Sequence, residues 1–347
     1  MVTWCACASG KSIAINKKAS ILLSISPVLE LKETMNRSIW FGLLFVTIGV
    51  FWRLNNEHIA LRIIVLAYDR PNSLEKCLDA LDDVIFNGDT IALNIWIDRK
   101  EGNGVNTEVL QMADGFQWQH GPKEVNVHNT RVGLYGQWMN TWQNADIVLY
   151  VEDDVDLSPW SYQWLKHASL TFMDNDRVAG ISLQDEYLII ASGQGRGAAL
   201  RRPPGPLFGY PIVGPWGFAP KESIWKDFLQ WYKEVSVIPG YKPYTDQADL
   251  YTKWYQDMEL AGRENTMWTM WFIHYCYIKD LVVLYPNIKF NNKGRVNSSL
   301  AVHRAEKGLH FGHRTKQSSQ PFMVSDWHDV FVDFGGNLTF VRYNGSY

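Results

Sequence analysis

The chain has few cysteines, which limits the kinds of site it can build. Only four occur in 347 residues, and none of their spacings is that of a zinc site. Cys77 and Cys276 lie in apolar patterns, so we expect buried free thiols rather than a bridge. The sequence therefore predicts neither a zinc protein nor a disulfide-stabilised fold.

A surplus of charge is also missing. The 33 Lys and Arg residues nearly balance the 36 Asp and Glu residues, and the formal net charge is −3. Such a chain has no strong positive field, so a nucleic-acid partner is not expected. Residues 67–71, after the first expected strand, contain no glycine, which disfavours a metal-dependent nucleotidyltransferase with a phosphate-binding loop.

An apolar run is present near the start of the chain. Residues 39–52 carry no charge and lie between Arg37 and Arg53. The run is shorter than the ~20 residues of a full membrane span, and three interpretations compete: a signal-peptide core, a buried helix or a short signal anchor. No small-residue cleavage site follows, and the run is apolar on all sides, so we favour the signal anchor.

Basic residues before this run predict a cytoplasmic N-terminus and a luminal body. A short anchor suits the thin membranes of the Golgi or endoplasmic reticulum. Because Met35 resembles a translation start, we suspect that residues 1–34 are a mis-assigned leader. The expected parts are a tail, a signal anchor, a short stem, one folded domain and a C-terminal tail, at residues 1–37, 38–53, 54–60, 61–320 and 321–347.

Strand patterns alternate with helix patterns through the body. We expect strands at residues 63–68, 91–97, 125–128, 147–151, 178–183 and 281–286. Helices are expected at residues 74–81, 108–113, 133–144, 160–173, 221–235 and 264–279, the first with Ser73 as its N-cap. This alternation predicts an α/β fold with a mixed, mainly parallel sheet flanked by helices.

A cluster of carboxylates after the fourth strand is the most informative segment. Glu152, Asp153 and Asp154 follow the apolar run 147–151 directly. Clustered carboxylates are unfavourable unless a positive partner neutralises them, and a divalent cation that also holds a phosphate is such a partner. A solvated, acidic strand end is the alternative interpretation.

Polar residues also follow the first two strands. Asp69 and Arg70 come after the first, and Asp98 after the second. Ligands of parallel α/β sheets bind at the carboxyl ends of strands, so we expect these residues to share one site with the carboxylates. Arg70 could hold a phosphate and Asp98 could accept hydrogen bonds from a ribose or a base, with a capping or surface role as the alternative for each.

Candidates for proton transfer and for a second metal ligand lie further along. Glu264 opens an expected helix, whose dipole favours an anion, and is the best candidate for a general base; Asp257 and Asp246 are rivals. His303 and His310 lie in a polar segment and could complete a metal site or contact a diphosphate, although solvated loop histidines are common. We select His310 as the predicted metal ligand.

Together these features resemble the nucleotide-sugar glycosyltransferases of the GT-A fold, nearest to the N-acetylglucosaminyltransferase I family of Golgi enzymes. The matching residues are 63–70, 76–79, 98, 151–155 and 214–217, and the last segment contains Trp216 and Gly217. The resemblance covers roughly residues 61–230. It implies a luminal GT-A domain behind an N-terminal signal anchor.

The resemblance also implies roles for individual residues. Asp154 looks like the direct Mn²⁺ ligand, and Glu152 and Asp153 look like contacts to the ribose and to metal-bound water. The other expected nucleotide-sugar contacts are Asp69, Arg70, Asp98, Trp216 and Gly217. The activity implied is inverting transfer from a UDP-sugar, best UDP-N-acetylglucosamine, to a hydroxyl of a glycan or glycoprotein.

The identity of the catalytic base stays open. The family's base lies in an Asp-Asp-Trp segment that this chain lacks; Asp257, in Trp-Tyr-Gln-Asp, is the nearest counterpart. Glu264 instead fits the wider GT-A pattern of an acid at a helix start before a closing strand. The alternative function is a catalytically inactive protein of the same fold that binds glycans or acts as a scaffold, which the 16 tryptophans would suit.

Overall fold

The computed structural model describes residues 58–184, 203–288 and 298–304, and residues 322–323, 334, 338–343 and 346 near the C-terminus. The predicted signal anchor at residues 38–53 and the predicted ligand His310 lie outside these ranges. Within the described residues, none of the helices has the length and apolar character needed to cross a membrane. The chain from Ile59 onward belongs to one compact unit.

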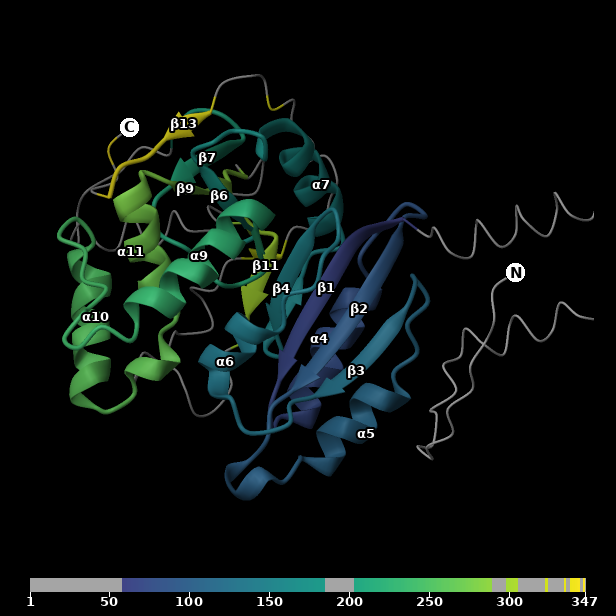
Figure 1. Ribbon diagram of the computed structural model, residues 1–347. Coiled ribbons are helices and arrows are strands. Elements are labelled where there is room, and N and C mark those ends of the chain that lie inside the picture. Colours follow the sequence, from purple (N-terminus) through teal and green to yellow (C-terminus); the bar gives the residue numbers. More distant parts are fainter. Residues whose placement is uncertain are drawn as a thin grey trace, which may run out of the picture. The chain divides into compact units, whose positions relative to one another are not determined.

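Four parallel strands form one half of the main sheet (Figure 1). β1 (Ile59–Ala67) lies between β2 (Thr90–Ile97) and β4 (Val148–Glu152), and β3 (Lys123–Val127) pairs with the outer side of β2. The β-branched and aliphatic sequences of β1, β2 and β4 favour buried strands, whereas the edge strand β3 is more polar and only partly buried. The helices between them are α4 (Pro71–Asp82), the 3-10 turn η2 (Glu101–Asn103), α5 (Thr107–Gly115) and α6 (Gly133–Asn140).

The other half of the sheet is mixed in direction. β8 (Phe218–Pro220) runs antiparallel to both β4 and β6 (Val178–Ser182), so it joins the two halves. The order through the described strands is β13-β7-β9-β6-β8-β4-β1-β2-β3, where the outer strands are β9 (Val282–Pro286), β7 (Leu207–Tyr210) and β13 (Thr339–Phe340). The predicted mixed, mainly parallel α/β fold is confirmed, although β7 and β8 were not predicted.

The remaining elements surround this sheet. The helices are α7 (Ser161–Phe172), α9 (Glu222–Val235), α10 (Asp249–Leu260) and α11 (Thr269–Lys279), with the 3-10 turn η3 (Glu264–Thr266) before α11. The described residues also form two short strand pairs: β5 (Val155–Leu157) with β11 (Ala301–His303), and β10 (Ser298–Ser299) with β12 (Phe322–Met323).

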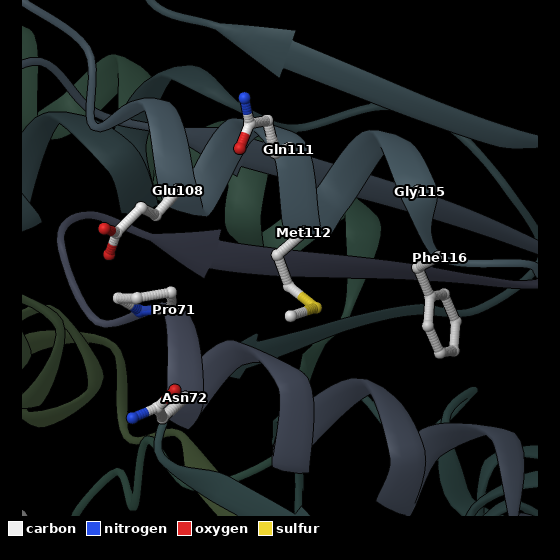
Figure 2. Close-up of a pocket in the computed structure, with 7 residues that line it drawn as sticks. All are labelled: Pro71, Asn72, Glu108, Gln111, Met112, Gly115 and Phe116. Carbon is white, nitrogen blue, oxygen red and sulfur yellow. The ribbon is translucent and has the colours of Figure 1, made fainter.

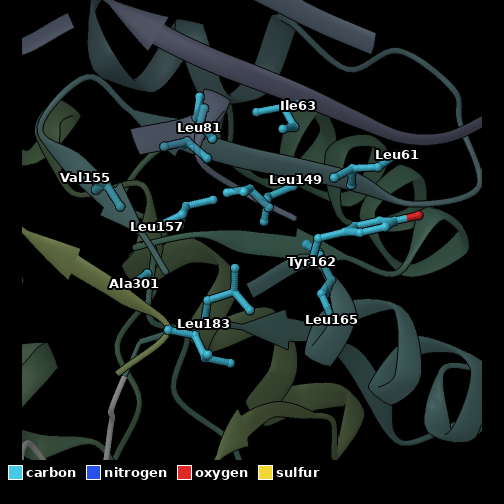
Figure 3. Close-up of a cluster of buried hydrophobic side chains, with 14 of the residues drawn as sticks. Leu61, Ile63, Leu81, Leu149, Val155, Leu157, Tyr162, Leu165, Leu183 and Ala301 are labelled. Carbon is cyan, nitrogen blue, oxygen red and sulfur yellow. The ribbon is translucent and has the colours of Figure 1, made fainter. Parts of the chain in front are cut away.

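The two faces of the sheet are packed differently. Ile63 and Val65 of β1 enter a largely aliphatic core, to which α4, α5 and α7 contribute. Figure 3 shows Ile63 in this core with Leu81 of α4 and Leu165 of α7. Ile64 and Leu66 enter an aromatic core on the opposite face, to which α6, α9, α10 and α11 contribute many Trp, Phe and Tyr side chains. Full burial of one Leu or Ile side chain contributes ~1.5–3 kcal/mol, so both faces stabilise the sheet.

The helix after β1 begins earlier than predicted. Pro71 occupies the first turn of α4, where its missing N–H has no helical partner to lose, and Arg70 takes the N-cap position. Ser73 lies inside the helix and donates its hydroxyl to the carbonyl oxygen of Asp153 at 2.9 Å. The prediction of Ser73 as the N-cap is therefore wrong, because a distant segment uses its hydroxyl.

The helix predicted at residues 264–279 is interrupted. Glu264 opens the three-residue turn η3, and α11 begins only at Thr269. So short a turn has little dipole, so the helix-start argument for an anionic Glu264 is wrong. The helix predicted at residues 133–144 also ends early, at Asn140.

The two cysteines of the body are buried free thiols, as predicted. Cys77 lies on α4, and its sulfur is 3.7 Å from the carbonyl oxygen of Glu152. Burial raises the pKa of the Cys77 and Cys276 thiols. A thiol with a raised pKa is a poor nucleophile, so both cysteines are packing residues.

Candidate active site

The carboxylates after β4 lie at the carboxyl end of the parallel half of the sheet. The backbone N–H of Asp153 donates to the carbonyl oxygen of Leu66 at 3.1 Å, which ties the segment to β1. We call residues 152–156 the acidic turn. Asp153 and Asp154 are only 2% and 3% exposed, so the interpretation as a solvated strand end does not hold.

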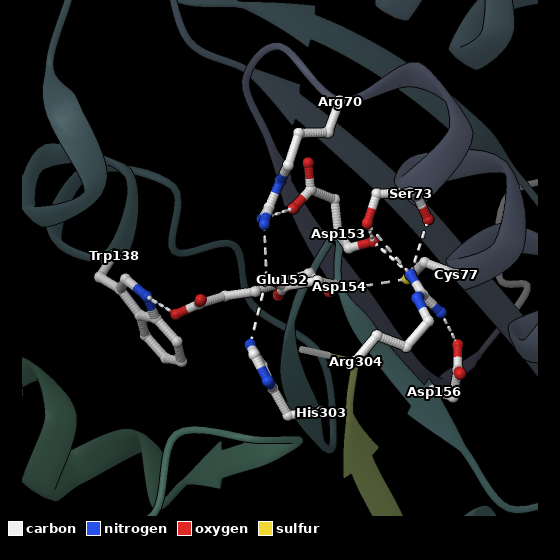
Figure 4. A network of polar contacts seen from close by, with 10 residues as sticks. All are labelled: Arg70, Ser73, Cys77, Trp138, Glu152, Asp153, Asp154, Asp156, His303 and Arg304. Carbon is white, nitrogen blue, oxygen red and sulfur yellow. Dashed lines mark hydrogen bonds and ion pairs between the residues drawn. The ribbon is translucent and has the colours of Figure 1, made fainter. Parts of the chain in front are cut away.

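Arg70 pairs with two carboxylates of the acidic turn (Figure 4). Its Nη1 donates to Asp154 Oδ2 at 2.6 Å, and its Nη2 contacts Asp153 Oδ1. Arg70 follows β1 and the two aspartates follow β4, so the parallel pairing of these strands brings them together. Burial disfavours the charged guanidinium, but the two carboxylates outweigh burial and raise the pKa of Arg70.

The two carboxylate oxygens of Asp154 differ in their surroundings. Oδ2 lies 3.1 Å from Nε2 of His303 and also accepts from Arg70. Burial acts to raise the pKa of Asp154, but His303 and Arg70 outweigh it and lower the pKa to about 2. Oδ1 is buried and makes no hydrogen bond in the part of the chain that the structure describes. A buried polar atom in that state is unfavourable, so Oδ1 is available to a cation.

His303 is held beside Asp154 by ring stacking. Its ring lies 5.0 Å from that of Trp216, at an interplanar angle of 20°. The backbone N–H of Trp216 donates to Gln184 Oε1 at 3.2 Å. Gly217 has a φ of +67°, and an added Cβ would come within 3.1 Å of Leu183, so glycine suits this position. Trp216 therefore stacks on His303, and Gly217 follows it in a turn that suits glycine; their roles as nucleotide-sugar contacts stay predictions.

Glu152 faces the aromatic core. Figure 4 shows it directed toward Trp138 of α6, whose Nε1 donates to Glu152 Oε1 at 3.2 Å. The Trp138 ring stacks against Tyr150 and Trp268, with centroids 4.8 Å and 4.2 Å away. Burial, reinforced by the charge of Asp154, raises the pKa of Glu152 to about 7. Glu152 is therefore partly protonated at neutral pH.

The acidic turn carries the charge that a divalent cation requires. It has four carboxylates, and two guanidiniums contact it, so two negative charges remain when all are ionised: Glu152, Asp153, Asp154 and Asp156 against Arg70 and Arg304. No group of three or more His, Cys, Asp or Glu forms a ready-made metal site within the described residues. Mn²⁺ and Mg²⁺ are commonly held by one or two carboxylates together with substrate phosphates, so Asp154 fits such an ion, and His303 lies beside it.

Asp98 lies at the end of β2 but serves the backbone. Its Oδ1 accepts from the N–H groups of Arg99 and Val132 at 2.8 and 2.9 Å, and its Oδ2 accepts from the N–H of Gly133 at 2.8 Å. The residue is 3% exposed. The structure thus uses both oxygens of this predicted nucleotide contact to hold the start of α6.

The other predicted residues are more peripheral. Asp69 is exposed, and its carbonyl oxygen accepts from Asn106 Nδ2 at 3.3 Å. Glu264 is half-buried in η3, which packs against α6 and α10, and Asp257 is exposed on α10. In the described part of the chain, neither candidate base belongs to the hydrogen-bond network of the acidic turn. Asp246, the third candidate, is also exposed.

Two residues of this network were missed at the sequence level. Arg304 pairs with Asp156 from 148 residues further along the chain, and no local pattern indicates such a contact. Trp138 was assigned only to a helix. His303 was considered beside His310, and the structure brings His303 to Asp154, whereas His310 lies outside the described residues.

A separate pocket of about 530 Å³ lies between α4 and α5 (Figure 2). Pro71 and Asn72 line it from α4, and Glu108, Gln111 and Met112 line it from α5. None of its lining residues belongs to the acidic turn, although Pro71 directly follows Arg70. The pocket adjoins the candidate active site and is not part of it.

No protein-family model matches the chain, and no curated protein sequence matches it. Among solved structures, the mannosyltransferase PcManGT from Pyrobaculum calidifontis, in complex with GDP-Man and Mn²⁺, matches 54% of this chain at 13% identity and a TM-score of 0.35. TarS 1-349 from S. aureus, in complex with UDP-GlcNAc, matches 67% at 14% identity and a TM-score of 0.35. The galactosyltransferase LgtC, with donor and acceptor sugar analogues, matches 52% at 14% identity and a TM-score of 0.29.

These matched structures are glycosyltransferases, and the chain covers 56%, 60% and 66% of their own lengths. All three TM-scores are 0.35 or lower, so the likeness carries no argument about the activity of this chain. The resemblance to the N-acetylglucosaminyltransferase I family stays a prediction from the sequence.

Proposed function

We propose that this protein is a metal-dependent, inverting glycosyltransferase that moves a sugar from a UDP-sugar to a hydroxyl of a glycan or glycoprotein. The observation that carries the proposal is Asp154 Oδ1, a buried carboxylate oxygen without a hydrogen-bond partner in the described part of the chain. It lies in a cluster whose four carboxylates outnumber the two guanidiniums that contact them. N-acetylglucosamine is the proposed sugar, on the sequence resemblance alone.

In this proposal Asp154 and His303 hold a divalent cation, and Mn²⁺ is the first candidate. His310 is a further candidate ligand. The cation would neutralise the diphosphate leaving group of the donor. Arg70 already lies against Asp153 and Asp154, so its guanidinium is placed to contact the same diphosphate. Glu152 and Asp153 are the proposed partners of the ribose and of bound water.

The acceptor hydroxyl needs a base in a single displacement. Glu264 is the first candidate because η3, on which it lies, packs against α6, and α6 carries the Glu152 partner Trp138. Asp257 is the rival. Glu264→Gln should leave UDP affinity unchanged and lower turnover strongly. If Asp257→Asn has that effect instead, the base is Asp257.

The proposed cellular location rests on the sequence alone. We propose that residues 38–53 anchor the chain in a Golgi or endoplasmic reticulum membrane with the body in the lumen. Expression of the full chain in animal cells, followed by protease treatment of sealed microsomes, tests this. A luminal body is protected until detergent is added, and digestion without detergent would contradict the proposal.

A donor panel tests the proposed reaction. Purified protein is incubated with different UDP-sugars and a mixture of glycan acceptors, with Mn²⁺ or with a chelator, and UDP release is measured. We expect release that depends on both the metal and the acceptor. Metal-dependent UDP binding without any release would instead favour the inactive, glycan-binding protein, and UDP release that survives the chelator would contradict the metal site.

A further inference from the structure

Arg304 approaches the acidic turn on the side of Ser73 and Asp156, and Figure 4 shows Trp138 on the other side. It directly follows β11, which pairs antiparallel with β5. The backbone N–H of Arg304 donates to the carbonyl oxygen of Asp154 at 2.7 Å. A strand from the distal part of the chain thus reaches the backbone of the proposed metal ligand.

The Arg304 guanidinium binds three separate groups. Its Nη1 pairs with the carboxylate of Asp156, and its Nη2 donates to the carbonyl oxygens of Ser73 and Asp153, each at 2.7 Å. Ser73 in turn donates its hydroxyl to the Asp153 carbonyl oxygen at 2.9 Å. The side chain of Arg304 is 16% exposed, so these bonds are largely shielded from water.

These contacts join three segments: the first turns of α4, the acidic turn and the end of β11. Arg304 fixes main-chain oxygens and Asp156, so the Asp153 and Asp154 carboxylates are left to Arg70, His303 and a ligand. The planar guanidinium presents donors in a fixed fork, and lysine has no such geometry. The arrangement of Asp153 and Asp154 therefore depends on a residue that hydrogen-bonds to their main-chain oxygens.

We infer that Arg304 is a positioning residue, which sets the cation and nucleotide affinity of the acidic turn by fixing its backbone. The inference rests on the proposed function, since it concerns the same site. Partners that orient metal ligands typically change metal affinity 10- to 100-fold when they are removed. A residue with a merely structural role would lower the melting temperature and leave the affinity of the folded protein unchanged.

The test uses the full chain and the variants Arg304→Lys, Arg304→Ala and Asp156→Asn. Arg131→Ala is the matched control, because Arg131 pairs at 2.8 Å with Glu101, an exposed carboxylate outside the acidic turn. Mn²⁺ affinity is measured with and without UDP by calorimetry and by electron paramagnetic resonance of bound Mn²⁺, at a temperature where every variant is folded. Circular dichroism checks the folded fraction.

We expect ~10- to 100-fold weaker Mn²⁺–UDP binding for Arg304→Ala, a smaller loss for Arg304→Lys and Asp156→Asn, and an altered resonance spectrum of the Mn²⁺ still bound. Arg131→Ala should bind as the wild type does. Folded Arg304 variants with wild-type affinity and spectrum would overturn the inference and leave the proposed function intact. If Arg304→Ala does not fold, the Mn²⁺–UDP affinity and the resonance spectrum of Arg304→Lys test the inference instead. Absence of Mn²⁺–UDP binding by the wild type would overturn both proposals.

Discussion

Two strand ends of the same sheet carry equally buried carboxylates that serve different purposes. Asp98 after β2 and Asp154 after β4 are each 3% exposed. Asp98 accepts three hydrogen bonds from backbone N–H groups, whereas Asp154 has side-chain partners and one oxygen without a hydrogen bond in the described part of the chain. Burial and position at a strand end therefore do not separate a structural carboxylate from a candidate ligand; these two differ in the unused hydrogen-bonding capacity of Asp154.

The largest expected effect concerns Asp154, the carboxylate that is proposed to bind the cation. Asp154→Asn removes the charge that faces the proposed cation, so we expect Mn²⁺-dependent UDP affinity to fall ~100-fold or more, equivalent to ~3 kcal/mol. Titration calorimetry with UDP and Mn²⁺ measures this. Asp114→Asn, at an exposed aspartate of α5 with no predicted role in the site, is the control. Unchanged affinity in Asp154→Asn would remove the distinction between the two carboxylates.

Asp98→Asn tests whether the other carboxylate, Asp98, stabilises the fold. The asparagine side chain carries no charge, and its NH₂ group faces a backbone N–H where a carboxylate oxygen accepts a hydrogen bond in the wild type. The free energy of unfolding should therefore fall by about 3 kcal/mol. Urea denaturation measures this, and Asp69→Asn should change the same quantity by less than ~0.5 kcal/mol. A stable Asp98→Asn variant that loses UDP binding would instead make Asp98 a nucleotide contact.

A smaller effect is expected from His128, which lies beside Asp98. His128 is 7% exposed and packs against Trp96, with ring centroids 4.9 Å apart. Burial lowers the pKa of His128, although the charge of Asp98 and a hydrogen bond with Gln137 oppose the shift. The histidine therefore stays neutral in the folded protein at a pH where it is charged in the unfolded chain.

The sign of the pH effect follows. Below pH ~6.5 the unfolded chain binds a proton at His128 that the folded protein does not, so the contribution of His128 to stability falls as the pH decreases, by at most ~1.4 kcal/mol per pH unit. Glu152, whose pKa is raised, acts in the opposite direction over the same range. Relative to the wild type, His128→Gln should therefore lose less stability, or gain more, between pH 6.5 and 5.5, measured by urea denaturation with a chelator present. His274, whose pKa burial also lowers, remains and keeps part of the slope. An unchanged slope would contradict this assignment.

Local patterns were sufficient for much of the fold and for the centre of the site. The apolar run before Glu152 predicted β4, and parallel strands that end together predicted that Arg70 shares one site with Asp153 and Asp154. The burial of Glu152, Asp153 and Asp154 could not be predicted from the local sequence, since exposed acidic turns have the same composition. It depends on β1, β8 and the segment after β11.

The features that were missed depend on contacts between distant segments. β8 has three residues, and its pairing with β4 and β6 determines it rather than its own periodicity. Asp98 was assigned to a nucleotide because nothing in its neighbourhood shows that the backbone at Val132 and Gly133 turns back toward it. Arg304 has no sequence signal at all, because its partners Ser73 and Asp153 lie far back along the chain.

Trp138 has two roles in one ring. Its faces stack on Tyr150 and Trp268, and its N–H satisfies Glu152. Tryptophan combines a large stacking area with an N–H donor on the ring itself. Phenylalanine lacks the donor, and histidine lacks the stacking area. This position therefore has little freedom to drift among related sequences, and a relative with another residue here should carry a compensating change at Glu152.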